Sequence, residues 1–275
     1  MNRFVDGRAA YAYTGGRPFD AALPCVVFIH GALHDHSVWT LAARWFAHHG
    51  HGVLAVDQPA HGRSAGPALP SVEALAAWVL AWLDAVGVAR AALVGHSIGS
   101  LVALEAAARA PARIDRLVMV GTAVPMKVSD ALLSTALEAP LVAIDRVNAF
   151  SHGTLAAEPS YPGPGSWLHG GNRALMRRVL ARGEGQAPGN LFHHDFSLCD
   201  AYANGLQAAQ AVRCPATLVL GEHDQMTPPP AARELAQALR ADTVLLPTGH
   251  ALMQEAPDAL LAALRRGLGV PAGAA

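Results

Sequence analysis

The chain has little charge and almost no lysine. Charged residues make up 15% of its 275 residues, and Lys127 is the one lysine among 20 basic residues. An average soluble domain carries about 25% charged residues. With a formal net charge of -1 and no basic run, the sequence offers no electrostatic surface for nucleic acid or anionic lipid. The arginine bias and the abundant alanine are typical of a GC-rich bacterial genome.

Cysteine is scarce, and no apolar run is long. The three cysteines, Cys25, Cys199 and Cys214, do not suit a disulfide framework, so we expect a reducing, cytoplasmic compartment. The first residues lack the basic and apolar stretches of a secretory signal peptide. Hydrophobic residues make up 52% of the chain, but none of the runs approaches the ~20 residues of a membrane span. The composition therefore predicts a large core and no membrane association.

Short apolar runs alternate with helical segments along most of the chain. The runs fall at 24–31, 52–64, 89–97, 114–123, 215–224 and 242–250. Continuous apolar strands are typical of a parallel sheet that is covered on both faces. The helix signals include Ser71 as an N-cap and Gly87 just past the end of the same segment. We predict an α/β fold with a mostly parallel open sheet and helices on both faces.

Residues 125–204 interrupt this alternation. The segment begins with helical sequence, passes through the Pro- and Gly-rich stretch "AAEPSYPGPGSWLHGGN", and ends in more helical sequence. Its aromatic and leucine content favours a packed structure over a poorly ordered loop. We therefore predict a helical cap at 125–204, inserted between the core segments 1–124 and 205–275.

The segment "ALVGHSIGSLVAL" places Ser97 between Gly95 and Gly99, after an apolar strand and before a helical pattern. G-x-S-x-G in this context is the pattern of a nucleophile elbow. The serine there adopts a strained backbone conformation, and the glycines let strand and helix approach closely. The pattern predicts an exposed hydroxyl at the edge of the sheet, next to a helix N-terminus.

Four stretches in this order resemble the α/β-hydrolase superfamily. They are "HGALHDHSVW", "DQPAHGRS", "GHSIG", and "GEHDQMTP" followed by "PTGHALMQEAPD". Each follows a predicted strand, at the edge of an open α/β sheet where ligands bind. The resemblance covers nearly the whole chain and implies the α/β-hydrolase fold.

The family's chain order of serine, acid and histidine implies a triad of Ser97, Asp224 and His250. A serine needs a base to take its proton, and the base needs an acid to orient it. Asp195 and Asp200, in or near the predicted cap, are the alternatives for the acid. Of the fourteen histidines, His250 is the one that stands where the pattern requires it.

The resemblance also implies an oxyanion hole and a substrate pocket. The backbone N–H groups of Ala32 and Ile98 are its expected donors, with Leu33 as the alternative to Ala32. We expect His30 to brace this loop and Trp39 to pack beneath it. The pocket candidates, chosen by location alone, are Leu33, His34, Phe150, His152, Trp167 and Met226.

Other polar clusters suggest structure and not chemistry. Asp57, His61, Gly62 and Ser64 belong to "DQPAHGRS", and we expect them to fix the geometry of that loop. The histidine groups at 34–36, 48–51 and 193–195 lack the spacing of a metal site. The sequence contains no phosphate-binding loop or dinucleotide fingerprint, so we expect no metal and no cofactor.

These residues predict a hydrolase that cleaves a small carboxylic ester, thioester or lactone through an acyl-enzyme on Ser97. The expected partner is a small-molecule substrate, and the protein is a monomer or homodimer. Epoxide hydrolases and haloalkane dehalogenases of this fold use aspartate at the elbow, which Ser97 excludes. Two alternatives remain. A carbon–carbon bond hydrolase shares the triad but has a different oxyanion loop, and a small-molecule receptor would bind without turnover.

Overall fold

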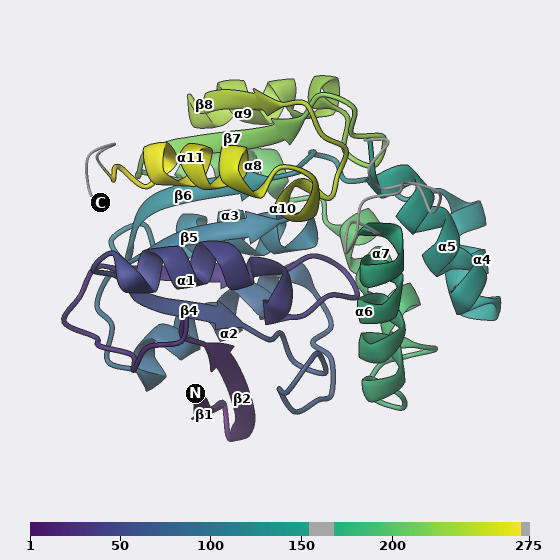
Figure 1. Cartoon of the computed structure of the whole chain (residues 1–275), viewed down its shortest axis with the longest axis horizontal. Helices are drawn as coiled ribbons and strands as arrows, with labels where there is room; N and C mark the ends of the chain where they lie inside the picture. The colour runs from purple at the N-terminus through teal and green to yellow at the C-terminus, as the bar shows by residue number, and fades with distance from the viewer. Residues whose placement is uncertain (154–167, 271–275) are drawn as a thin grey trace.

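One eight-stranded sheet forms the centre of the protein, in the order β1-β2-β4-β3-β5-β6-β7-β8. The computed structural model describes residues 1–153 and 168–270 (Figure 1). The strands are β1 (Asn2–Val5), β2 (Arg8–Tyr13), β3 (Cys25–Ile29), β4 (Gly52–Val56), β5 (Ala91–His96), β6 (Ile114–Val120), β7 (Ala216–Gly221) and β8 (Asp242–Leu246). From β4 to β8 neighbouring strands are parallel, whereas β1 and β2 are antiparallel additions at one edge.

The burial of the strands explains which of them the sequence predicts. Every residue of β3, β4, β5 and β7 is buried, as continuous apolar runs require. The β1–β2 hairpin was not predicted. Its strands mix exposed and buried residues, so they show no continuous apolar run.

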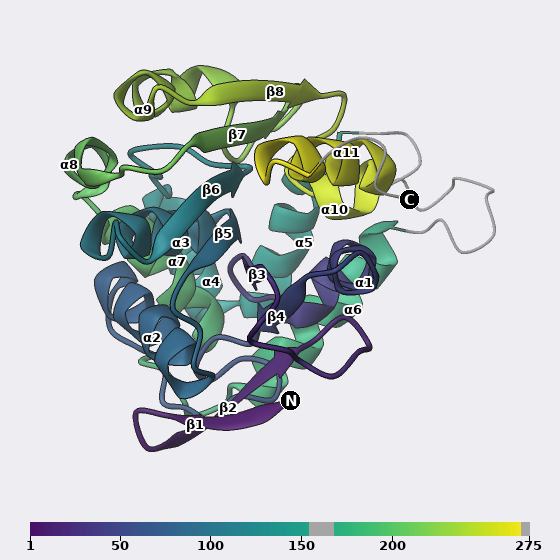
Figure 2. The same ribbon diagram turned by 90° about the vertical axis from the view of Figure 1, so that its left-hand side faces the viewer.

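Helices cover both faces of the sheet, and α1 and α11 lie on the opposite side from α2, α3 and α8 (Figures 1 and 2). The core helices are α1 (Thr40–His48), α2 (Val72–Ala85), α3 (Ile98–Arg109), α8 (Gly205–Ala211), α9 (Arg233–Leu239), α10 (Leu252–Glu255) and α11 (Pro257–Gly267), with 3-10 turns at His36–Trp39 and Pro229–Ala232. Ser71 caps α2 by accepting a hydrogen bond from the Ala74 N–H. The predicted fold class is confirmed.

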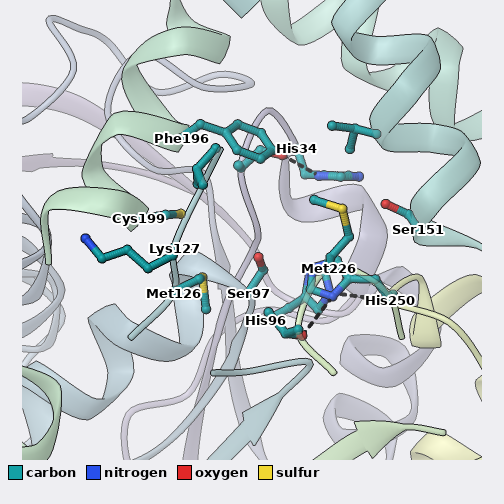
Figure 3. A pocket seen from close by; sticks show the side chains of 14 residues that line it. His34, His96, Ser97, Met126, Lys127, Ser151, Phe196, Cys199, Met226 and His250 are labelled. Atoms are coloured by element: carbon teal, nitrogen blue, oxygen red, sulfur yellow. Dashed lines mark hydrogen bonds between the residues drawn. The ribbon is translucent and has the colours of Figure 1, made fainter. Parts of the chain in front are cut away.

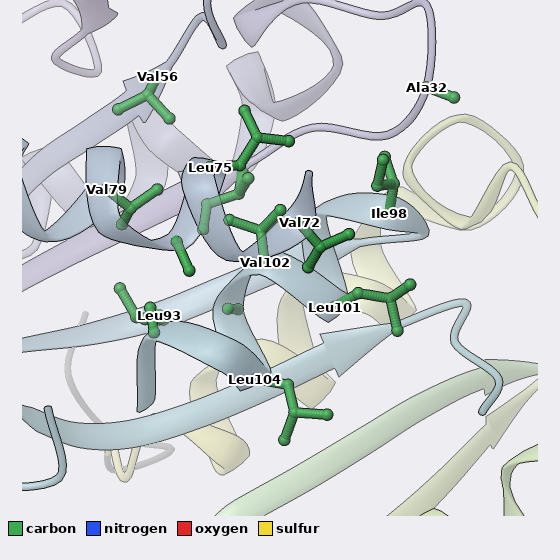
Figure 4. Packing of buried hydrophobic residues seen from close by; sticks show 14 of the residues in the cluster. Ala32, Val56, Val72, Leu75, Val79, Leu93, Ile98, Leu101, Val102 and Leu104 are labelled. Atoms are coloured by element: carbon green, nitrogen blue, oxygen red, sulfur yellow. The ribbon is translucent and has the colours of Figure 1, made fainter. Parts of the chain in front are cut away.

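Buried aliphatic side chains hold α2 and α3 against the sheet (Figure 4). Leu75 and Val79 of α2 belong to the same buried cluster as Leu101 and Val102 of α3, with Leu93 of β5 beneath them. Each fully buried side chain of this size contributes about 1.5–3 kcal/mol of transfer free energy. This packing fixes the start of α3, where Ser97 lies.

The segment 125–204 contains helices α4 (Asp130–Glu138), α5 (Pro140–Ser151), α6 (Leu168–Arg182) and α7 (Leu191–Ala201). Its described residues include no strand, and these helices gather beside the carboxyl ends of the parallel strands (Figure 1). Where the chain leaves α7, the buried Glu105 of α3 accepts hydrogen bonds from the Tyr202 hydroxyl at 2.8 Å and the Asn204 amide at 2.9 Å. Within the described parts of the chain, no helix is long and apolar enough to cross a membrane.

Candidate active site

Ser97 occupies a strained turn between β5 and α3. Its φ of 53° and ψ of -125° lie outside the regions that most residues adopt. A Cβ at Gly95 would overlap the carbonyl oxygen of Gly99, and one at Gly99 would lie 2.5 Å from the carbonyl oxygens of Ile29 and His30. The two glycines therefore permit a backbone contact that brings α3 directly against the strand ends.

Asp224 and His250 form a buried hydrogen-bonded pair. His250 Nδ1 lies 2.8 Å from Asp224 Oδ2, and the Thr227 hydroxyl donates to the same oxygen at 2.7 Å. The other oxygen accepts the N–H groups of Met226 and Thr227, both at 2.8 Å. Because a carboxylate only accepts, Nδ1 carries the hydrogen, and Nε2 of the neutral ring has the lone pair that a base needs.

These contacts keep Asp224 ionised. Burial by itself raises its pKa, but the electrostatic interaction with His250 and the hydrogen bonds from His250 and Thr227 outweigh burial and hold the pKa below its ordinary value. A carboxylate in this state can stabilise an imidazolium on His250.

Ser97 and His250 line one cavity (Figure 3). Among the described residues, no hydrogen bond joins the Ser97 hydroxyl to His250, and such bonds are often long before substrate binds. The neighbouring His96 supports this arrangement, because its Nε2–H donates to the His250 carbonyl at 2.9 Å and its ring lies 4.7 Å from the His250 ring. Burial lowers the pKa of His96 well below its usual value, so that ring is neutral.

The backbone N–H groups of Ile98 and Ala32 are the expected donors to a substrate oxygen. Ile98 is the first residue of α3, and its N–H has no carbonyl partner within the helix. Ala32 lines the cavity, and neither N–H has a hydrogen-bond partner among the described residues. The alternative donor, Leu33, is not available, since its N–H already donates to Asp195 at 2.8 Å.

The cavity is small and largely apolar, with a volume of about 50 Å³. Its lining consists of Ala32, His34, His96, Ser97, Met126, Lys127, Val128, Val147, Ser151, Phe196, Cys199, Met226, Thr227 and His250. Ser97 lies between Met126 and Met226, and Phe196 and His34 lie across the cavity from it (Figure 3). Residues inside and outside the segment 125–204 both contribute to the lining.

Of the predicted pocket residues, His34 and Met226 line this cavity, and three others lie outside its lining. Phe150 is 51% exposed, because it lies on a different side of α5 from the lining residue Ser151. Leu33 and His152 are buried but outside the lining. Leu33 packs in the core cluster, and the His152 ring is hydrogen-bonded at both nitrogens. Trp167 lies outside the described residues.

Sequence reasoning missed several lining residues. His96 directly precedes Ser97 and Thr227 follows Asp224 by three residues, so their positions in the motifs could have indicated them. Val147, Phe196 and Cys199 come from α5 and α7. No local pattern connects these residues to Ser97, because their proximity depends on how the segment 125–204 folds back over the sheet.

The alternative acids have other partners. Asp195 pairs with His61 Nε2 at 2.9 Å. Asp200 lies 3.4 Å from Lys127 Nζ and accepts the Val128 N–H. Neither replaces Asp224 beside His250.

Asp35, His36 and Asp57 form the one group of potential metal ligands found among the described residues. Their atoms are already hydrogen-bonded within the protein. Asp57 accepts from the His36 ring at 2.8 Å and from the Arg63 N–H at 2.8 Å, and Asp35 accepts from Arg178 at 3.0 Å. These bonds fix the loops after β3 and β4, as the sequence predicts for Asp57.

Residues 24–257 match the family model of the alpha/beta hydrolase fold. The chain belongs to this family. It is 32% identical to the pimeloyl-[acyl-carrier protein] methyl ester esterase of Chromobacterium violaceum over 222 residues. This match covers 79% of this chain and 80% of that protein. It is 35% identical to the sn-1-specific diacylglycerol lipase ABHD11 of Mus musculus over 102 residues, 37% of this chain and 33% of that one.

Several matches to relatives are partial. For three of them, the mouse diacylglycerol lipase included, the chain spans only about a third of the relative's length. The crystal structure of the enol-lactonase from Burkholderia xenovorans LB400 superimposes with a TM-score of 0.80 at 24% identity, covering 98% of this chain and 100% of that one. At this identity the likeness shows the fold. The sequence relatives include proteins named as an esterase, a lipase and a carbamate hydrolase.

Proposed function

We propose that this α/β hydrolase cleaves a small carboxylic ester, thioester or lactone through an acyl-enzyme on Ser97. The observation that carries the proposal is the buried Asp224–His250 pair, with its 2.8 Å hydrogen bond, beside the strained Ser97 in one cavity. A neutral histidine oriented by a carboxylate is the base that a serine nucleophile requires.

In the first half of the reaction, Ser97 Oγ attacks the carbonyl carbon of the substrate while its proton moves to His250 Nε2. The oxygen that gains charge accepts hydrogen bonds from the N–H groups of Ile98 and Ala32. His250 then gives the proton to the leaving oxygen or sulfur. The bond to the leaving group breaks, and the acyl group stays on Ser97.

In the second half, His250 takes a proton from water and the hydroxyl attacks the acyl carbon. The same two N–H groups hold the oxygen of the second intermediate. His250 returns the proton to Ser97 Oγ as the carbon–oxygen bond breaks, and a carboxylic acid leaves. The ionised Asp224 stabilises the imidazolium in both halves.

The cavity supports a short acyl group. The cavity has a volume of about 50 Å³. Because one water occupies ~10–15 Å³ of cavity volume, the cavity has room for about four waters. Met126, Phe196 and Met226 give it apolar walls. We therefore expect acetyl and butyryl esters to react faster than octanoyl esters.

The proposal is tested by labelling the purified protein with a fluorophosphonate and measuring its intact mass and its hydrolysis of p-nitrophenyl esters. We expect one label per chain in the wild type and none in Ser97→Ala. Ester turnover in that variant should fall at least about 10³-fold, because triad members act as a unit. Ser134→Ala, on the exposed face of α4, is the control and should retain labelling and turnover.

Absence of labelling in well-folded wild-type protein would overturn the proposal. Tight binding of an ester without turnover would indicate the receptor alternative. Turnover of a vinylogous diketone in preference to any ester would indicate carbon–carbon bond hydrolysis.

A further inference from the structure

The peptide group between Ala32 and Leu33 is held at both ends. Its N–H, on Leu33, donates to Asp195 Oδ2 at 2.8 Å, and its carbonyl, on Ala32, accepts from His34 Nδ1 at 2.7 Å. The other ring nitrogen of His34 lies 2.8 Å from the Asn172 side chain on α6. Groups of the segment 125–204 therefore fix this peptide on its N–H side directly and on its carbonyl side through His34.

Leu33 needs such support because its backbone is strained. Its φ of 52° is in the left-handed region, which costs a non-glycine residue on the order of 1 kcal/mol or more. The Leu33 side chain is fully buried, so its packing also holds it in place. Without the Asp195 bond, the N–H of Leu33 would be left without a partner, and rotation of this peptide would displace the adjoining Ala32.

Asp195 itself is buried, at 4% exposure, and comes from the middle of α7. The oxygen that accepts the Leu33 N–H also accepts His61 Nε2–H at 2.9 Å. Burial raises the pKa of Asp195, but the charge and hydrogen bond of His61 outweigh burial and lower it. At His61 burial lowers the pKa, and Asp195 outweighs burial and raises it.

A buried charged pair adds little stability compared with well-packed apolar side chains. Its placement is more informative, because Asp195 lies between two loops that follow β3 and β4. One contains Ala32 and Leu33, and the other contains His61. The pair therefore joins α7 to the expected oxyanion loop by directional bonds that apolar packing would not provide.

We infer that Asp195 is a positioning residue that, together with His61, holds the Ala32–Leu33 peptide so that the Ala32 N–H faces the substrate oxygen. This inference rests on the proposed function. It makes α7 part of the support of the oxyanion hole, so that the core loop is in its active geometry only when this helix is docked.

The test compares Asp195→Ala with Asp195→Asn, which keeps an oxygen able to accept both hydrogen bonds. The readouts are kcat, KM, and the inhibition constant of a short trifluoromethyl ketone, whose hemiketal with Ser97 places an oxyanion in the hole. Asp145→Asn, which breaks an exposed ion pair with Arg173 on the cap, is the matched control. Thermal unfolding of each variant checks that it is folded.

Removing an oxyanion donor costs roughly 10²–10³ in kcat, and displacing a group by ~1 Å can cost about 10². For Asp195→Ala we expect kcat to fall about 10–100-fold with KM changed less than about 3-fold. The inhibition constant should rise by the same factor as KM/kcat, since both depend on the oxyanion. Asp195→Asn should keep kcat within about 5-fold of the wild-type value. The control, Asp145→Asn, should have the wild-type kcat.

An Asp195→Ala variant that is folded and keeps its kcat and its ketone affinity would overturn the inference. If Asp195→Ala does not fold, Asp195→Asn decides the question. A folded Asp195→Asn variant whose ketone affinity falls by about 10²–10³-fold, the cost of losing an oxyanion donor, would also overturn the inference. Failure of the proposed function is seen separately, as wild-type protein that neither reacts with fluorophosphonate nor hydrolyses esters.

Discussion

The Thr227 hydroxyl and the His250 ring converge on one oxygen of Asp224, at 2.7 and 2.8 Å. A hydrogen bond to a charged group contributes about 1.5–3 kcal/mol. Thr227 therefore stabilises the ionised carboxylate and fixes its rotation, while the backbone N–H groups of Met226 and Thr227 hold the second oxygen. The orientation of His250 depends on this complete set of donors.

Thr227→Val should lower kcat several-fold and leave KM within about 2-fold, because Asp224 would keep its charge but lose one of its orienting donors. The free energy of unfolding should fall by about 1–3 kcal/mol. Ester kinetics and chemical unfolding measure the two effects. Unchanged kcat in the variant would show that the backbone donors suffice.

Thr248→Val is the matched control for that substitution. The Thr248 hydroxyl is buried and has no partner among the described residues, so replacing it with a methyl group removes an unsatisfied donor. The change should be neutral or stabilising.

At the scale of elements, the junction of β5 and α3 decides where the nucleophile lies. The strand and the helix meet backbone to backbone at Gly95 and Gly99, and α3 also contacts β3 through the carbonyl groups of Ile29 and His30. Because the neighbouring atoms belong to the backbone, they cannot move aside for a side chain at Gly95 or Gly99.

Gly95→Ala should destabilise the protein by about 1–3 kcal/mol or more, because its Cβ would overlap the backbone of Gly99 and Ser100. Loss of ester hydrolysis should accompany the shift in unfolding midpoint, since α3 must move and carry Ile98 with it. A variant with wild-type stability would contradict this account of the elbow.

Gly171→Ala gives the opposite expectation. Gly171 lies within α6, and a Cβ there would meet no atom of the described residues within 4 Å. Alanine is favoured over glycine in a helix by about 1 kcal/mol, so this variant should be slightly more stable than the wild type.

Buried histidines shape the pH dependence of the whole molecule. Burial lowers the pKa of His30 to about 4, and it lowers those of His34 and His96 as well. Histidines in an unfolded chain titrate near ~6.5, so below that pH the unfolded state binds protons that the folded state does not. His61 shifts the other way, and its contribution is present below ~6.5 and lost as pH rises through its folded pKa.

The unfolding temperature should therefore rise from pH 4.5 to about 6.5, and above that pH the loss of the His61 contribution should oppose any further rise. His30 alone, with a pKa of about 4, accounts for on the order of 3 kcal/mol over its full range. Carboxylates with lowered pKa, such as Asp35 at about 2, lose their contribution at more acid pH. Calorimetry at intervals of half a pH unit measures the trend. An unfolding temperature that decreases as the pH is raised from 5 to 6.5 would contradict the prediction.

Much of the fold was predictable from the sequence because each prediction depended on neighbouring residues. Continuous apolar runs predicted β3 and β5, which are buried on both faces. Ser71 indicated the start of α2. Ser97 and Ile98 are at positions that the elbow motif defines by spacing alone. The exposed β1–β2 hairpin left no such trace.

The tertiary structure decided what surrounds these residues. Phe196 and Cys199 line the cavity, Phe150 does not, and Asp195 meets Leu33 across 162 positions of the chain. The strand ends are specified by local periodicity and turn residues. Contacts between the sheet and the segment 125–204 depend on how helices pack against distant loops, which no spacing in the sequence encodes.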